Sequence, residues 1–268
     1  MVDPPDEAGL RARQTDYSSY LFIDDLLRLQ QPLTDGAEDE MLFIVVHQAY
    51  ELWFKLVLHE LEGARDSLLR AEPWHATRRL RRAVAAEELL VGQLRVLETM
   101  SPEGFFEFRD PLAPASGFQS VQFREIEILS GGFGASPGAV NAYDAEARER
   151  LERRSSEPTL WHATLVALAH HGWLPESDAD RTDDLVLGAV GAIYHDHADP
   201  IRAWFHELFE HLMDHDEVIA RWRYHHMLMA SREIGGRPGT GGSLGVAYLG
   251  RTLDKRFFPV LWELRSKL

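Results

Sequence analysis

A chain of 268 residues, of which 45% are hydrophobic, has enough apolar material to fill a large core. Its formal net charge of -15 argues against a protein that binds nucleic acid through phosphate contacts, because such binding needs clustered Lys and Arg. The absence of cysteine excludes disulfides, thiolate nucleophiles and iron–sulfur clusters, and leaves histidine and carboxylates as the strong metal ligands.

The first residues carry no sign of a targeting segment. MVDPPDEAGLRARQ is polar and has no apolar stretch. No uninterrupted apolar run reaches the roughly 18 residues of a membrane-spanning helix. We therefore expect a cytoplasmic protein with no membrane partner, in which residues 1–16 form an N-terminal arm.

Apolar residues recur at spacings of three and four along most of the chain, which predicts helices. Segment 39–64 is apolar nearly all round and is expected to be a buried helix, whose acidic start suits the positive end of the helix dipole. Segment 75–100 is amphipathic and is expected to pack on one face. Further helices are expected over residues 17–30, 118–129, 183–195, 200–233 and 245–264.

Two breaks interrupt this pattern. Residues 130–141 form a Gly/Pro-rich stretch and residues 152–159 a polar connector. They outline a small helical excursion, roughly residues 131–180, inserted into an otherwise continuous helical body. With no internal repeat, the simplest interpretation is one all-α domain over residues 1–268.

Several histidines could be functional. His47 follows Phe43 by one helical turn on the apolar segment 39–64, so the two side chains share a face; a lone histidine there is more often a core residue. The histidines of 195–199, and His211 with His215, could bind a metal, but zinc signatures are absent and solvated helix ends explain them more simply. His170 and His171 precede a glycine, which is typical of a helix C-terminus.

Two loops complete the candidates. Arg109 stands at the head of a Pro- and Gly-containing loop, where it is either a surface charge or a clamp for a ligand carboxylate. The stretch GRPGTGGSLG, residues 236–245, lacks the phosphate-binding pattern GxxxxGK[ST]. It is either a helix cap and turn or a place where the backbone approaches a ligand near Thr240.

Together these segments resemble the tryptophan 2,3-dioxygenase family of haem enzymes. The similar stretches, in the family's order, are YSSYLFIDDLLRLQQPL, DEMLFIVVHQAYELWFKLVLHEL, FRDPLAPASGFQSVQFREIEIL and RWRYHHMLMASREIGGRPGTGGSLGVAYLGRTLDKRFFPVLWELR. They cover all of the chain except the region near residues 130–200. The resemblance implies an all-α fold that holds haem b between its helices.

The resemblance also implies a cofactor site. His226 corresponds to the proximal haem ligand, and therefore to the metal ligand, with the adjacent His225 as the alternative. The glycine loop packs against the haem in the family, which carries over to four residues here: Gly239, Gly241, Gly242 and Ser243.

The same comparison implies a substrate site for L-tryptophan or a derivative. His47 corresponds to the distal histidine that faces the indole, and Arg109 to the clamp of the substrate carboxylate. Thr240 corresponds to the residue that bonds the amino-acid end. The remaining implied substrate-binding residues are Phe43, Ile44, Val45, Val46 and Phe105, together with Tyr17 and Tyr20, which in the family reach a neighbouring subunit of a homotetramer, a dimer of dimers.

The implied reaction inserts O₂ across the indole C2–C3 bond of L-tryptophan to give N-formyl-L-kynurenine. Leu244 stands where the family commonly has a second serine. A monooxygenase of the same fold, forming an oxindole from tryptophan or a substituted tryptophan, is therefore kept as an alternative. A non-catalytic haem sensor is the second alternative.

Overall fold

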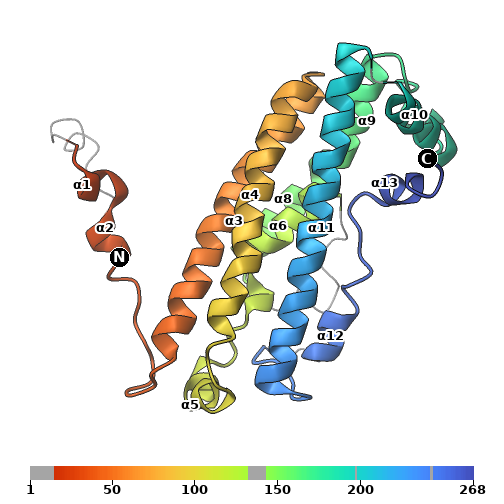
Figure 1. Ribbon diagram of the computed structural model, residues 1–268. Helices are drawn as coiled ribbons and strands as arrows, with labels where there is room; N and C mark the ends of the chain where they lie inside the picture. The colour runs from red at the N-terminus through yellow and green to blue at the C-terminus, as the bar shows by residue number, and fades with distance from the viewer. Residues whose placement is uncertain (1–14, 132–142, 197, 242–243) are drawn as a thin grey trace.

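The protein is described here by a computed structural model of residues 15–131, 143–196, 198–241 and 244–268. All regular secondary structure in these residues is helical, which confirms the predicted all-α class (Figure 1). The elements are α1 (Tyr17–Leu21), α2 (Ile23–Leu26), α3 (Glu40–Leu69), α4 (Pro73–Leu97), α5 (Pro102–Leu112), η1 (Gly117–Gln119), α6 (Val121–Ser130), α8 (Ala145–Ser156), α9 (Leu160–His170), η2 (Asp178–Asp180), α10 (Asp183–His195), α11 (Pro200–Ile234), α12 (Val246–Gly250) and α13 (Pro259–Leu264).

Three long helices, α3, α4 and α11, form the body of the molecule (Figure 1). α4 packs against both α3 and α11, and fully buried residues such as Leu61, Leu80 and Phe209 fill the space between them. Each such side chain contributes about 1.5–3 kcal/mol through removal from water. The amphipathic and apolar patterns of the sequence thus become one packed core.

A tight turn joins α3 to α4. Ala71 adopts a left-handed conformation with φ of 56°, which ends the helical path after Leu69. Pro73 then opens α4, where its missing N–H costs nothing because the first helical N–H groups have no intrahelical partner. The two helices therefore run antiparallel and share a long contact.

α3 is also the one described helix that is long and apolar enough to cross a membrane, by length and composition alone. The core helix of a globular protein has the same properties. Here one side of α3 packs against α4, α6 and α9, whereas Val45, Leu52 and Leu56 are exposed. The expectation of a helix buried nearly all round was therefore wrong.

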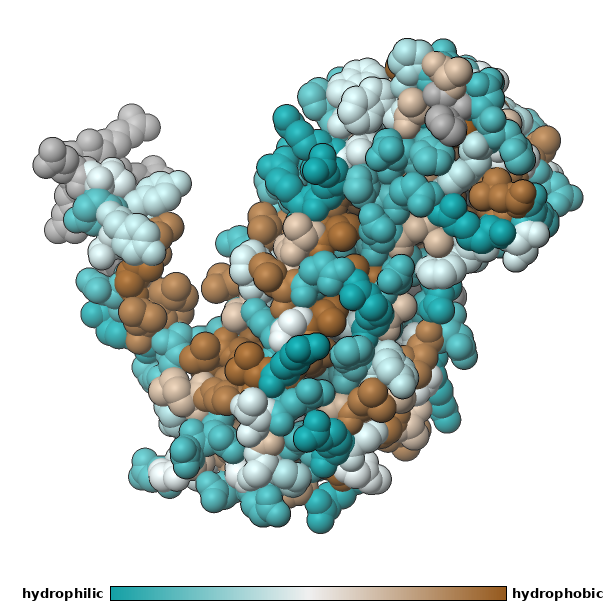
Figure 2. Space-filling model, viewed as in Figure 1, coloured by the Kyte–Doolittle hydropathy of each residue, from teal (hydrophilic) through white to brown (hydrophobic). Residues whose placement is uncertain are grey.

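The N-terminal segment, residues 15–38, stands away from the body (Figure 1). Its aromatic residues Tyr17 and Tyr20 are largely exposed. Figure 2 shows hydrophobic side chains on the segment and on the body across the open space between them. The segment contacts the body from Leu29 onward, where Gln48 of α3 donates to the Leu29 carbonyl at 3.0 Å. Further along, the backbone N–H groups of Leu33 and Thr34 donate to the buried carboxylate of Glu40, at 2.8 and 2.9 Å.

Several predicted helix boundaries were wrong. The expected helix 17–30 is split into α1 and α2 because Phe22 has a φ of 51°. The expected helix 245–264 is likewise two short helices, α12 and α13. α5 was missed, although Ser101 caps it and Pro102 opens it, which is a helix-start signal visible in the sequence. α9 ends at His170 and Gly172 has a φ of 74°, as the glycine there predicted.

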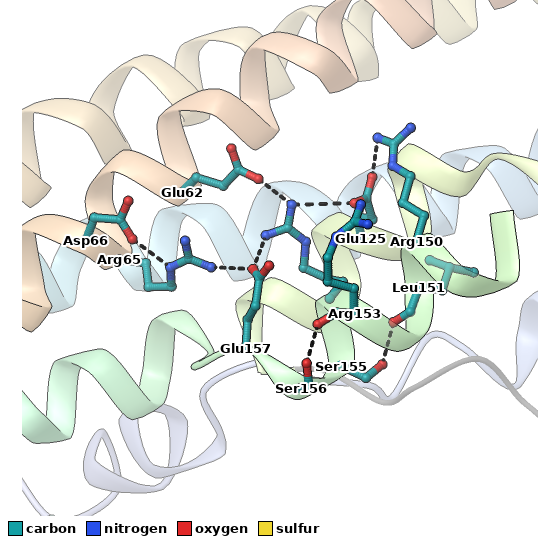
Figure 3. Close-up of polar contacts among 11 residues, drawn as sticks. Glu62, Arg65, Asp66, Glu125, Arg150, Leu151, Arg153, Ser155, Ser156 and Glu157 are labelled. Atoms are coloured by element: carbon teal, nitrogen blue, oxygen red, sulfur yellow. Dashed lines mark hydrogen bonds and ion pairs between the residues drawn. The ribbon is translucent and has the colours of Figure 1, made fainter. Parts of the chain in front are cut away.

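The expected connector 152–159 is mostly helical, because Asp144 caps α8 and the helix continues to Ser156. Arg154 of α8 ties this helix to the body through Glu62 of α3 and Glu125 of α6 (Figure 3). α9 contributes the fully buried Leu160 to the main core. This part of the expected excursion is therefore packed closely on α3 and α6.

Candidate functional site

A cavity of about 570 Å³ opens among α3, α4, α5, α6 and α11, with the glycine loop and α12 on one side. Phe43, His47, Phe105, Arg109, Thr240 and His226 all line it. Six residues singled out in the sequence, from four separate segments, thus meet at one place.

α11 supplies one wall of this cavity. Trp222, His226 and Glu233 lie at spacings of four and seven, so they project from the same helical face. The His226 ring stacks on Trp222 with centroids 5.0 Å apart and planes inclined by 10°. His225, about 100° further round the helix, is exposed and contacts the Tyr224 ring instead.

His226 has the properties of an available ligand. Neither ring nitrogen meets a hydrogen-bond partner in the described part of the chain, although the residue lines the cavity. Burial, with a smaller contribution from the nearby His47, lowers the pKa of His226 to about 4. The imidazole is therefore neutral near pH 7, and a neutral imidazole is the form that binds a metal.

His47 lies on the α3 wall. Its Nδ1 is 2.7 Å from the carbonyl oxygen of Phe43, one turn earlier. Because a carbonyl only accepts, Nδ1 carries the proton and Nε2 of the neutral ring remains an acceptor. Burial also lowers the pKa of His47, which favours this neutral form, although the bond to Phe43 opposes the shift. The Phe43 ring lies 4.0 Å from His47 and 6.0 Å from Phe105, which makes the wall aromatic.

Arg109 lies in the last turn of α5, so the expectation that it heads a loop was wrong. Its Nη2 donates to the carbonyl of Pro238 at 2.7 Å, while its buried Nε has no partner among the described residues. Thr240 Oγ1 donates to the carbonyl of Ala115 at 2.7 Å. These two bonds hold the glycine loop against α5 and the segment that follows it.

Close packing explains some of the loop glycines. A Cβ on Gly241 would lie 2.8 Å from the Cβ of Ser116, and one on Gly245, whose φ is 57°, would lie 2.6 Å from the carbonyl of Arg237. Gly239 lines the cavity, whereas Gly241 is exposed. The other two predicted loop contacts, Gly242 and Ser243, lie outside the described residues.

Five predicted substrate contacts do not line this cavity. Val45 points to solvent and Val46 packs in the core, while Ile44 borders a smaller neighbouring cavity. Successive residues of a helix are rotated by about 100°, so a continuous run cannot face one ligand. Tyr17 and Tyr20 are exposed on α1, away from the cavity of their own chain.

Some lining residues were missed in the sequence. Trp222 and Glu233 could have been found by stepping along the helix from His226. Tyr50, whose hydroxyl donates to the Leu90 carbonyl at 2.7 Å, follows His47 by three residues on the same face of α3. Arg124 and Arg223 carried no local signal, because only tertiary packing brings them to the cavity.

The described residues contain no cluster of three or more His, Asp or Glu side chains that could hold an ion. Of the histidines at 195–199, His197 lies outside the described residues. His211 pairs with Asp214, and His215 is fully buried against Glu87 and Ser130. The residues of the cavity, in contrast, fit a large planar cofactor held by one neutral imidazole: the space is roomy, mostly apolar in its lining, and supplied with the unpartnered His226.

Comparison with known proteins agrees with the motifs. Residues 5–181 and 181–268 match the family model of tryptophan 2,3-dioxygenase. The chain is 45% identical over 268 residues to a tryptophan 2,3-dioxygenase from a Nocardioides species, with 97% of each chain covered. It is 44% identical over 262 residues to that of Herpetosiphon aurantiacus, covering 94% of this chain and 98% of the relative, and 40% identical over 263 residues to that of Bacillus anthracis, covering 94% and 92%.

Proposed function

Because the chain belongs to the tryptophan 2,3-dioxygenase family, we propose that it is a haem-dependent oxygenase that converts L-tryptophan and O₂ into N-formyl-L-kynurenine. The observation that carries this proposal is the meeting of His226, His47 and Arg109 at one apolar cavity. These residues would supply an axial ligand for haem, a hydrogen-bond acceptor for the substrate and a clamp for its carboxylate.

His226 is the proposed axial ligand of haem b. Its depressed pKa keeps the imidazole neutral, and its stacking on Trp222 holds the ring in one orientation. When bound, haem supplies the iron that activates O₂. The apolar walls keep water away from the reacting atoms.

The substrate is oriented by polar groups at its two ends. Arg109 retains an unpartnered Nε for the substrate carboxylate, and the charge-assisted bond of a guanidinium suits that group. Thr240 lies on the loop that Arg109 helps to hold and is the proposed contact of the amino-acid end. His47 Nε2 accepts the indole N–H, while Phe43 and Phe105 bracket the ring. These contacts would position the indole C2–C3 bond for reaction, so their role is orientation more than acid–base catalysis.

The exposed N-terminal segment supports a homotetramer in which Tyr17 and Tyr20 contact a neighbouring subunit. Aromatic side chains left in water are unfavourable, and a second copy would cover them. Light scattering tests this. The full chain is expected at four times its 30.5 kDa mass, and the double variant Tyr17→Ser/Tyr20→Ser at a smaller multiple. An unchanged mass would contradict the proposed contact.

Mass spectrometry of the product formed from ¹⁸O₂ tests the reaction. Two labelled atoms in one molecule of N-formylkynurenine, formed without added reductant, are expected. One labelled atom in an oxindole, formed only with reductant, would replace the dioxygenase by a monooxygenase. Haem binding without any tryptophan product would indicate the sensor.

A further inference from the structure

The end of the cavity between α6 and α11 carries two buried arginines. Arg124 is 8% exposed and Arg223 is 4% exposed, and both line the cavity. They share a single carboxylate, that of Glu127: Arg124 pairs with one oxygen, and Arg223 Nη2 pairs with the other at 2.8 Å. Two positive charges thus meet one negative charge.

The other groups that contact these arginines are neutral. Arg124 approaches the Tyr248 hydroxyl at 3.4 Å and lies over the Phe118 ring at 4.7 Å. Arg223 donates to the Lys255 carbonyl at 3.4 Å and lies over the Phe257 ring. The buried Nε of Arg124 has no hydrogen-bond partner in the described residues.

Lys255 lies near the same charges. Burial lowers its pKa; Glu127 opposes that shift, and the charges of Arg223 and Arg124 add to it. The side of the cavity near α12 therefore holds Lys255 as well as the two arginines.

Another arginine with a buried side chain has more carboxylate partners. The Arg154 side chain is 10% exposed and bonds three carboxylates, those of Glu62, Glu125 and Glu157, although its Nε, like that of Arg124, has no partner among the described residues (Figure 3). An isolated buried charge is costly, so arginines at this depth are expected to be compensated. Arg124 and Arg223 line a cavity, and among the described residues the two together pair with only one carboxylate, that of Glu127.

A buried carboxyl group lies elsewhere on the cavity. Glu233, 7% exposed, has an Oε2 without a hydrogen-bond partner among the described residues. Burial raises its pKa; the charge of Arg232 opposes that shift, and the carboxylates of Asp39, Glu103 and Glu98 add to it. An anionic ligand group is therefore not favoured beside Glu233. The cationic places on the cavity are Arg124 with Arg223, and Arg109, which is assigned to the substrate carboxylate.

We infer that Arg124 and Arg223 form an anion subsite of the cavity that receives the propionate carboxylates of the cofactor. The inference rests on the proposed function, since it takes haem as the cavity's occupant. A guanidinium fork matches a carboxylate, and the propionates are the anionic groups of an otherwise apolar macrocycle. Arg223 precedes His226 by one helical turn, so the subsite and the proposed axial ligand belong to the same face of α11. The arginine subsite and the axial ligand together would allow haem only one orientation in the cavity.

Titration of the full chain, prepared free of haem, tests this with two porphyrins. One is haem and the other is haem dimethyl ester, whose propionates carry no charge; Soret absorbance measures binding. Tryptophan is left out, so that a substrate carboxylate cannot contribute. The wild type is expected to bind haem at least about tenfold more tightly than the ester, and Arg124→Gln is expected to lose most of that preference.

Two further variants keep the test independent of folding defects. Arg154→Gln, which removes an equally buried arginine away from the cavity, is expected to retain the preference for haem. Arg124→Lys, which keeps the charge, is expected to retain part of it. Equal binding of haem and ester by the wild type, or an undiminished preference in Arg124→Gln, would overturn the subsite and leave the oxygenase intact. Binding of neither porphyrin would overturn both.

Discussion

Two histidines on α11, about three turns apart and both turned inward, have opposite surroundings. His215 is fully buried, with Nδ1 2.8 Å from Glu87 Oε1 and Nε2 2.8 Å from Ser130 Oγ. His226 lines the cavity and has no hydrogen-bond partner among the described residues. Both ring nitrogens of His215 are hydrogen-bonded, whereas in the described part of the chain those of His226 are not, and this difference, rather than burial, marks His226 as the candidate ligand.

The partners of His215 join three helices. Glu87 belongs to α4 and Ser130 ends α6, and Ser130 Oγ also reaches the carbonyl of Ile126 at 2.7 Å. Because the Ser130 proton goes to that carbonyl, its oxygen can accept from His215. His215 therefore stabilises packing, whereas His226 is left available for chemistry.

The largest expected effect is on haem content, which should fall in a variant of His226 but not in one of its neighbour His225. His226→Ala should abolish stoichiometric haem, since it removes the proposed axial ligand, while His225→Ala should retain it. The Soret absorbance per chain, after expression with added haem, measures the difference. Retention of haem by His226→Ala together with its loss in His225→Ala would reassign the ligand.

His215→Ala should instead lower stability. Removing His215 leaves the buried Glu87 Oε1 without its hydrogen-bond partner, at a cost of about 1–3 kcal/mol. Urea denaturation of the haem-free chain checks this, with His226→Ala as the matched variant on the same helix, for which a change below about 1 kcal/mol is expected. Comparable losses in the two variants would remove the distinction drawn between them.

Arg109→Gln should weaken substrate binding with haem still in place. Loss of a charge-assisted bond of about 1.5–3 kcal/mol corresponds to a roughly 10- to 100-fold rise in KM for L-tryptophan. Tryptamine, which lacks the carboxylate, should bind the variant and the wild type alike. Arg237→Gln is the control, because Arg237 lies nearby over the Phe106 ring but does not line the cavity.

The smallest effect concerns Glu233, whose pKa is raised above its ordinary value of 4.5 by burial. A carboxyl with a raised folded-state pKa contributes stability that is present below the unfolded pKa and is lost as pH rises through the folded one. Glu233→Gln cannot ionise, so it should raise the Tm of the haem-free chain at pH 8, by roughly 2–4 °C for about 1 kcal/mol, and change it little at pH 4.5. The exposed neighbour Glu103 provides the control variant Glu103→Gln. A gain at pH 4.5 equal to that at pH 8 would contradict the assignment.

Helical periodicity and local motifs alone predicted much of this protein. The apolar pattern indicated the three long helices, and the i, i+4 spacing put Phe43 and His47 on one face. The ordered motifs indicated the family, and with it His226, Arg109 and Thr240, which the structure brings to one cavity. These features depend on residues within a few turns of one another, or on segments long enough to be recognised.

Tertiary structure alone decided which polar groups are paired. His215 meets Glu87 and Ser130 from 128 and 85 positions away, and Arg223 meets Glu127 from 96. No local spacing encodes such contacts, because they arise when separate helices pack. The sequence therefore identified two histidines on one helix, and only the packing of α4 and α6 left one of them satisfied and the other free to bind.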